Sequence, residues 1–208
     1  MYRTLRFVFE KELRQKPYII IIISALLFLP GDLGNLFAVI FASTILTREL
    51  ETKNYALIST LPVSKYEIYL SYYIFGASIF LLSKGIYFGI TKNNDLKTLM
   101  LSLLFFAFFY GLSVLSSIKG LGGIYVPIVI WVIDLFLKSN SVISDYSVVM
   151  QKNIFINIIS VFLFFASMFI FHFTDSSNYT RSKNKIFTLL GIGIILIIVA
   201  WFLFNTLK

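Results

Sequence analysis

The apolar residues of this chain are gathered into seven blocks that are separated by short polar segments. The blocks cover residues 18–29, 33–47, 68–90, 98–117, 124–137, 154–173 and 187–207. Four of the seven come close to the roughly 20 residues that a helix needs to cross a bilayer. The chain is also 58% apolar and 13% charged, so a soluble domain of its 208 residues would leave large apolar patches in water. The pattern predicts an all-α, polytopic transmembrane helix bundle, with residues 1–208 forming a single domain.

The number of spans depends on residues 30–35, PGDLGN, a cluster of helix-breaking residues between the first two blocks. If the cluster is an outer turn, both blocks cross and the chain has seven spans; if the two blocks form one broken span, it has six. With seven spans, twelve lysines and arginines lie on inner segments and five on outer ones. With six spans, the best division is ten inner and seven outer. Because inner segments carry an excess of these residues, the positions favour seven spans. We therefore predict a multi-pass protein of the cell membrane, with six to seven spans and a cytoplasmic N-terminus.

Residues 1–17, which precede the first apolar block, have the spacing of an amphipathic helix. The apolar side is formed by Leu5, Val8, Phe9 and Leu13. The opposite side carries the i,i+4 series Arg6, Glu10 and Arg14. Because Pro17 ends the segment, we expect a separate helix that lies along the inner surface of the membrane. The alternative is a plain basic flank of the first span.

Residues 48–67, RELETKNYALISTLPVSKYE, connect the second and third blocks. The first part, with Glu49, Glu51 and Lys53, continues the second span into the cytoplasm. The chain then breaks at Leu61 and Pro62, because the residue before a proline avoids the helical region.

A new helix is predicted to start at Ser64. Ser64 and Glu67 have the S-x-x-E spacing of a capping box, in which each side chain satisfies a free amide at the helix start. Val63 and Ile68 stand at the two positions of a hydrophobic staple. These signals predict a rigid helix-turn-helix that leads directly into the third span. The plainer explanation is that any polytopic protein needs capped helices.

Two stretches in this layout are KELRQKP at residues 11–17 and ELETKNYALISTLPVSKYEI at residues 49–68. Their order, with a first helical hairpin between them, resembles the permeases of type-2 ABC exporters. The resemblance implies a homo- or heterodimer of permeases bound to two ATP-binding cassette ATPase subunits, which hold the ATP and Mg. It also implies that residues 1–17 form a connecting helix with Arg6, Glu10 and Arg14. The implied ATPase-coupling residues are Glu49, Glu51, Lys53, Tyr55, Leu61, Pro62, Ser64, Lys65 and Glu67. Six spans are the norm in that family, so block 187–207 would be an additional one.

Ionisable residues inside the apolar blocks are few. Lys84 and Asp134 fall at similar depths, and a functional interpretation would have them face one cavity as an intramembrane polar pair. We favour the alternative, in which Asp134 pairs with Lys138 one turn later and Lys84 reaches the outer headgroups. The lone histidine, His172, is expected at the surface. The aromatic run of residues 105–110 covers every side of its helix and is expected to contact lipid as well as neighbouring helices.

The sequence gives no sign of an enzyme. It has no cysteine, one histidine, no G-x-x-x-x-G-K-[ST], no H-E-x-x-H and no G-x-S-x-G, so no cofactor is expected on this chain. The net charge of +8 is explained by orientation in the membrane, with lipid and not nucleic acid as the partner.

The predicted function is outward transport of a substrate, such as a hydrophobic or amphipathic peptide or drug, by an ABC exporter of which this chain is the membrane subunit. Residues 138–153, between the fifth and sixth spans, would form an outer gate or cap. A non-transporting resistance, immunity or scaffold protein is the alternative. A secondary transporter is disfavoured because the chain has no inverted repeat.

Overall fold

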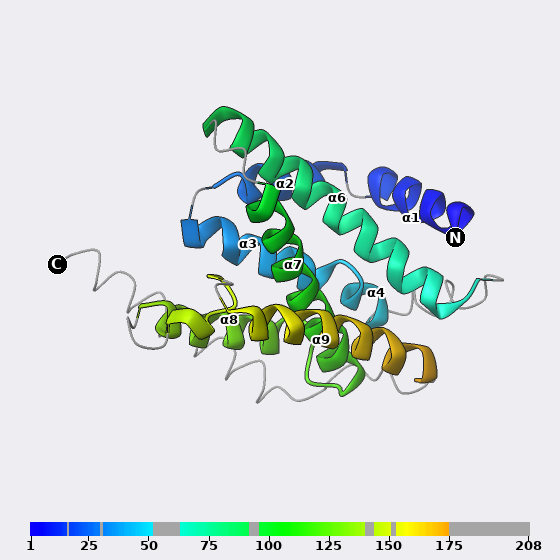
Figure 1. The fold of residues 1–208 in the computed structure, drawn as a ribbon. Helices are drawn as coiled ribbons and strands as arrows, with labels where there is room; N and C mark the ends of the chain where they lie inside the picture. The colour runs from blue at the N-terminus through cyan, green and yellow to red at the C-terminus, as the bar shows by residue number, and fades with distance from the viewer. Residues whose placement is uncertain are drawn as a thin grey trace.

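The computed structural model describes residues 1–15, 17–29, 31–51, 63–91, 96–139, 144–150 and 153–174, and no strand occurs in these ranges (Figure 1). The described α-helices are α1 (Tyr2–Gln15), α2 (Pro17–Leu27), α3 (Gly31–Thr44), α4 (Thr47–Glu51), α6 (Lys65–Thr91), α7 (Leu96–Ile118), α8 (Tyr125–Ser139) and α9 (Ile154–Phe173). A short 3-10 turn, η1 (Ser144–Tyr146), lies between α8 and α9. The predicted all-α class is confirmed for the described part of the chain.

Two of the described helices are long and apolar enough to cross a membrane, namely the part of α7 from Lys97 to Ile118 and the whole of α9. The 27 residues of α6 give it a length of about 40 Å. In contrast, α2, α3 and α8 have 11, 14 and 15 residues, fewer than the roughly 20 of a straight span. The last apolar block, residues 187–207, lies outside the described residues.

The predicted break between the first two blocks is present. The chain leaves α2 through a tighter turn, in which the amides of Phe28 and Leu29 donate to carbonyls three residues earlier, at 3.2 Å each. Gly31 then takes a left-handed φ of 67°, which favours glycine. Gly34 is pressed against the carbonyl of Leu29, where a side chain would not fit. Glycines therefore turn the chain sharply into α3.

The helices are arranged so that two groups of helix ends gather at opposite ends of the bundle (Figure 1). One group, at the right of Figure 1, contains α4, the start of α6, and the ends of α7 and α9; we call it the elbow end. The other group contains the start of α3 and the end of α8, which the ion pair of Asp32 and Lys138 joins. The long helices α6, α7 and α9 connect the two ends.

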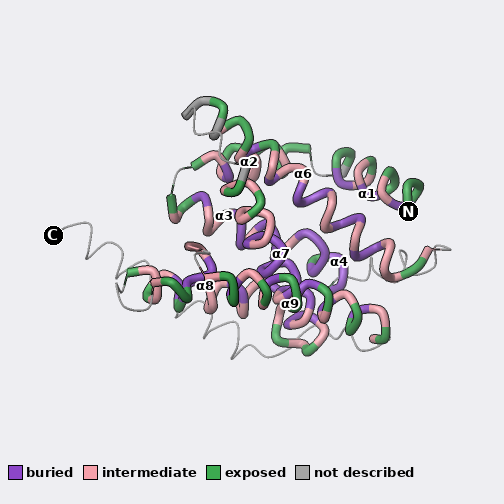
Figure 2. Tube along the Cα trace, viewed as in Figure 1, coloured by how far each residue is buried: buried purple, intermediate pink, exposed green. Residues whose placement is uncertain are grey.

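The core lies where α7 packs between its neighbours, and Figure 2 shows that burial is concentrated there. The aromatic residues of α7 are buried: Phe105, Phe106, Phe108, Phe109 and Tyr110 are each at most 8% exposed. The expectation that this run contacts lipid was therefore wrong, because α3, α6 and α9 cover it. The expected contacts with neighbouring helices are present. The outward side of α9 is exposed and apolar, with Phe162 71% accessible, as suits a helix in contact with lipid.

Helices α7 and α9 approach each other closely through one glycine. A Cβ on Gly111 would lie 3.0 Å from the hydroxyl of Ser167 and 3.1 Å from the carbonyl of Leu163. Tyr69 of α6 joins this contact, because its hydroxyl lies 2.6 Å from Ser167 Oγ and donates to the carbonyl of Phe164 at 3.1 Å. These buried hydroxyls fix α6, α7 and α9 relative to one another.

Candidate coupling site at the elbow end

The structure describes the residues on both sides of the predicted coupling segment. Helix α4 precedes it and residues 63–67 follow it; together we call these two flanks the elbow. Four of the predicted coupling residues, Lys53, Tyr55, Leu61 and Pro62, lie outside the described residues. The other five lie in the elbow, and each has a contact that the structure describes.

Glu49 of α4 forms a buried ion pair with α1. Its side chain is 2% exposed, and Lys11 Nζ lies 2.7 Å from its Oε2. The same ammonium donates to the hydroxyl of Tyr72 on α6 at 3.1 Å and lies 3.9 Å from the carboxylate of Glu12. Lys11 therefore contacts the helices on both sides of the coupling segment. Glu49 was expected on a continuation of the second span, but α3 ends at Thr44 and Glu49 lies on the separate helix α4.

Sequence reasoning did not single out Lys11, Glu12 or Tyr72. A signal was present, because Thr4, Val8 and Glu12 repeat every four residues and define the side of α1 that is buried. The series was not recognised as a buried side because Thr4 and Glu12 are polar, and polar side chains on an amphipathic helix are normally taken to face water.

Glu51, the last residue of α4, joins the elbow to the turn between α7 and α8. Its Oε1 accepts a hydrogen bond from Ser117 Oγ at 3.0 Å and another from the amide of Gly123 at 2.8 Å. Glycine is needed there, because a Cβ on Gly123 would lie 2.5 Å from both Ser117 Oγ and Thr47 Cβ. The carboxylate of Glu51 thus fixes where α8 starts relative to α4.

The predicted N-cap of α6 is present, but the capping box is only half formed. Ser64 Oγ accepts from the amide of Glu67 at 3.2 Å. The Glu67 carboxylate does not return to Ser64; it accepts from the α-amino group of Met1 at 2.7 Å and from Thr4 Oγ1 at 3.0 Å. These two hydrogen bonds, the first the stronger, lower the pKa of Glu67. The predicted capping partner therefore ties α6 to the start of α1.

Lys65 and Tyr66 attach the start of α6 to the end of α9. Lys65 Nζ donates to the carbonyl of Thr174 at 2.6 Å, so a positive charge stabilises the C-terminal end of α9. The ring of Tyr66 stacks on that of His172 with centroids 4.0 Å apart. His172 is half-buried rather than fully at the surface, and its Nδ1 has no hydrogen-bond partner among the described residues.

The predicted amphipathic helix is present as α1, and its buried side includes two of the expected apolar residues, Val8 and Phe9, together with the polar Thr4 and Glu12. The ion pair of Arg6 and Glu10 forms as predicted, at 2.7 Å, and it lowers the pKa of Glu10. Leu13, expected on the apolar side, is 50% exposed. The buried side packs lengthwise on α6, where the rings of Phe9 and Phe75 meet edge to face at 4.9 Å.

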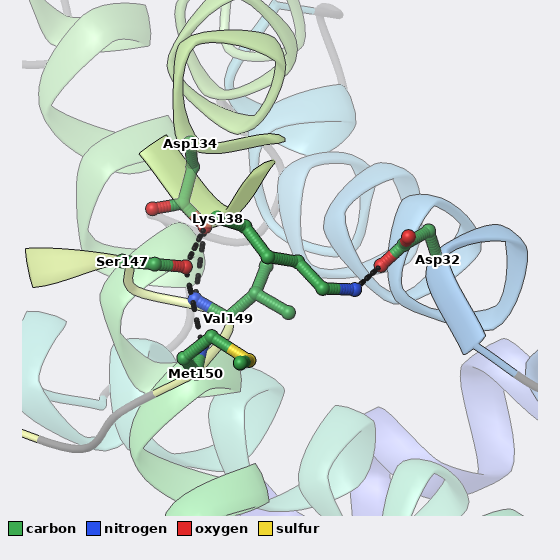
Figure 3. Close-up of polar contacts among 6 residues, drawn as sticks. All are labelled: Asp32, Asp134, Lys138, Ser147, Val149 and Met150. Atoms are coloured by element: carbon green, nitrogen blue, oxygen red, sulfur yellow. Dashed lines mark hydrogen bonds and ion pairs between the residues drawn. The ribbon is translucent and has the colours of Figure 1, made fainter. Parts of the chain in front are cut away.

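The polar residues at the opposite end pair differently from both expectations (Figure 3). Asp134 is buried and accepts from the amides of Val148 and Val149, at 2.6 and 2.9 Å, and from Ser147 Oγ at 3.0 Å. Lys138 instead forms an ion pair with Asp32, with 2.5 Å between its Nζ and Asp32 Oδ1.

Lys84 lies over the ring of Phe80, 5.9 Å from its centroid, and it forms no ion pair with Asp134 among the described residues. Asp134 therefore holds residues 147–149 in place, and the structure does not join it to Lys84. In the described part of the chain, no group of three or more His, Asp or Glu residues is placed to hold a metal ion.

No protein-family model matches this chain, and neither a search of curated proteins nor one of solved structures finds a match.

Proposed function

We propose that this chain is the transmembrane permease subunit of an ATP-driven ABC exporter, with six to seven spans and a cytoplasmic N-terminus. The ATPase is a separate cassette subunit that binds ATP and Mg, and a second permease, identical or not, completes the complex. The cargo leaves the cell; a hydrophobic or amphipathic peptide or drug suits the apolar character of the chain.

The observation that carries the proposal is the anchoring of both flanks of residues 52–62. On the α4 side, Glu49 is bound to α1 and Glu51 to the turn between α7 and α8. On the α6 side, Lys65 is bound to the end of α9 and Glu67 to the start of α1. A displacement of either flank would therefore also move the helices to which it is bound.

This anchoring supports a mechanical role. Packed helices shift as bodies because their interiors are dense and resist continuous deformation. A push on residues 52–62 by a cytoplasmic partner would therefore be passed to α4 and α6 and then to α1, α7, α8 and α9. The hydroxyl contacts of Tyr69 and Ser167 would carry the displacement deeper into the bundle.

The opposite end of the bundle suits the proposed outer gate or cap. Asp134 ties the described residues 144–150 to α8, and Lys138 ties the end of α8 to the first turn of α3. Motion of α8 started at Glu51 would therefore reach the segment between α8 and α9. In this proposal α8 transmits the motion that begins at the coupling segment to the outer cap.

Site-specific photo-crosslinking tests the proposal. Benzoylphenylalanine is placed at Tyr55, in the proposed coupling segment, and in a second variant at Tyr146, which is 54% exposed at the opposite end. After irradiation of cells and purification in mild detergent, mass spectrometry identifies the crosslinked proteins. We expect position 55, and not position 146, to capture an ATPase that carries a P-loop.

Two outcomes would contradict the exporter. One is a chain that purifies alone and gives no ATPase crosslink from position 55, which would favour the non-transporting resistance, immunity or scaffold protein. The other is ATPase capture from position 146, which would put the partner on the wrong end of the bundle. Glu51 and Lys65 are poor positions for this experiment, because their side chains bind groups within the chain.

A further inference from the structure

The outward side of α9 is a continuous apolar surface. Exposed apolar residues occur along the whole helix, Ile154–Phe173 (Figure 2). Phe162 is 71% and Phe169 59% exposed. The described helices α6 and α7 cover only the opposite side, where Phe164 and Ser167 are buried. In a membrane protein, an apolar surface of this length is covered by lipid or by another helix.

The last apolar block, residues 187–207, has the length and the position to cover it. The block lies outside the described residues and has 21 residues, against 20 in α9. Only residues 175–186 separate the two, and this connection starts at a fixed point, because Lys65 of α6 donates to the carbonyl of Thr174 at 2.6 Å. Consecutive helices with a short connection usually pack as antiparallel neighbours.

Other described helices offer a shorter apolar surface. Helices α2 and α8 also have several exposed apolar residues, but they contain 11 and 15 residues. A helix of 21 residues is about 30 Å long, which matches α9 and exceeds both of the others.

The side chains of the two segments also match in size. Counting away from the connection along each segment places Phe169 of α9 level with Gly191. The same count places Phe162 level with Ile198. Gly191 and Ile198 share one side of a helix, because seven residues make nearly two turns. A glycine opposite a phenylalanine leaves room for the ring, and small residues are common where membrane helices approach closely.

We propose that residues 187–207 pack antiparallel against the outward side of α9 as a seventh transmembrane helix, with Phe169 seated at Gly191. Motion of α9 would then extend to this helix, and a second permease would have to bind the bundle elsewhere. The inference rests on the seven-span form of the proposed function, but it does not require an ATPase.

Disulfide formation in the full-length chain tests this packing, because the chain contains no cysteine. In the test pair, Phe162→Cys is combined with Ile198→Cys, and membranes are treated with copper phenanthroline. Trypsin cuts between the two positions, at Arg181, Lys183 and Lys185, so a disulfide keeps the last fragment joined to α9 until a reductant is added. We expect this linkage to form, and mass spectrometry identifies the joined fragments.

Two control pairs retain Ile198→Cys. In one, Ser160→Cys is a conservative change on the buried side of α9, close to the level of Phe162. In the other, Ile133→Cys lies on α8, where Ile133 is 53% exposed. We expect the yield of disulfide in either control to be several-fold lower than in the test pair.

The glycine supplies a second readout. Gly191→Leu should lower the yield of the test pair several-fold, because the added side chain would push against Phe169. Gly193→Leu is the matched control, since two residues further on is nearly the opposite side of a helix, and it should leave the yield unchanged. An unchanged yield in Gly191→Leu would overturn the seating of Phe169 at this glycine.

Equal yields in the test pair and both controls would overturn the proposal, and so would linkage by Ile133→Cys in place of Phe162→Cys. A second pair on the proposed contact is Phe165→Cys with Ile195→Cys; no disulfide in either this pair or the test pair would assign the outward side of α9 to lipid. Linkage of two chains by Phe162→Cys alone would assign it to a second copy. A disulfide without an ATPase crosslink from position 55 would keep this packing and remove the exporter, whereas the converse would remove the packing alone.

Discussion

The ammonium of Lys11 lies between a carboxylate of α4 and a hydroxyl of α6, and all three side chains are largely withdrawn from water. Removing charges from water costs several kcal/mol per ion, and the pairing must offset that cost. Such a network therefore contributes less to net stability than to specificity: it fixes the position of α1 relative to both flanks of the coupling segment. Glu51 and Lys65 act in the same way through backbone groups at helix ends.

The first prediction concerns this buried pair. Lys11→Met should lower the free energy of unfolding by about 3 kcal/mol, because it leaves Glu49 buried without the ammonium. In a chain of this size that corresponds to a fall in Tm of roughly 10 °C, measured on the detergent-solubilised protein. Adding Glu49→Leu should recover part of the loss, since the double variant removes both charges.

Arg6→Gln is the control for this experiment, because it breaks an exposed pair on the same helix. It should leave Tm unchanged. An unaltered Tm in Lys11→Met, or a double variant less stable than Lys11→Met, would show that the pair does not hold α1 in place.

At the scale of elements, local sequence signals predicted several breaks between helices, but not the one between α3, which ends at Thr44, and α4, which begins at Thr47. The glycine and proline cluster of residues 30–35 separates α2 from α3, and Ser64 caps α6, because these effects depend on neighbouring residues alone. The buried side of α1 could be predicted only in part: Val8 and Phe9 were expected on it, but the contacts of Lys11 were not. Tyr72, which accepts from Lys11, lies 61 residues further along the chain, and a helical pattern does not specify such a contact. For the same reason the partners of Glu67 and Asp134 were not foreseen.

The second prediction concerns the contact of α7 with α9. Gly111→Leu would push a side chain into Ser167 and the backbone of α9, and overpacking of this kind typically costs about 1–3 kcal/mol. Gly85→Leu is the matched control, because no other side chain or helix of the described residues lies within 4 Å of the Cβ position on that glycine of α6. Thermal unfolding should show a lower Tm for Gly111→Leu and an unchanged or higher one for Gly85→Leu. Equal Tm values in the two variants would mean that α7 and α9 are not closely packed at Gly111.

At the scale of the whole molecule, the structure has two differently organised ends. At the elbow end, charged residues of α1, α4 and α6 bind groups on other helices. At the other end, Asp134 and Lys138 hold a short segment and the start of α3. Composition predicted the helical class, because the apolar excess leaves few other folds. The described helices include two that are long and apolar enough to cross a membrane, and the larger number of spans remains a prediction from block lengths and charge positions.

The sidedness of the elbow is the central claim, and the chain allows a direct measurement because it contains no cysteine. Two single-cysteine variants, Lys53→Cys in the coupling segment and Tyr146→Cys at the opposite end, are treated with a membrane-impermeant maleimide. We predict that Tyr146→Cys is labelled on intact cells and that Lys53→Cys is labelled only after the cells are opened. Labelling of Lys53→Cys on intact cells would place the coupling segment outside, where no cytoplasmic ATPase could bind it, and would contradict the account.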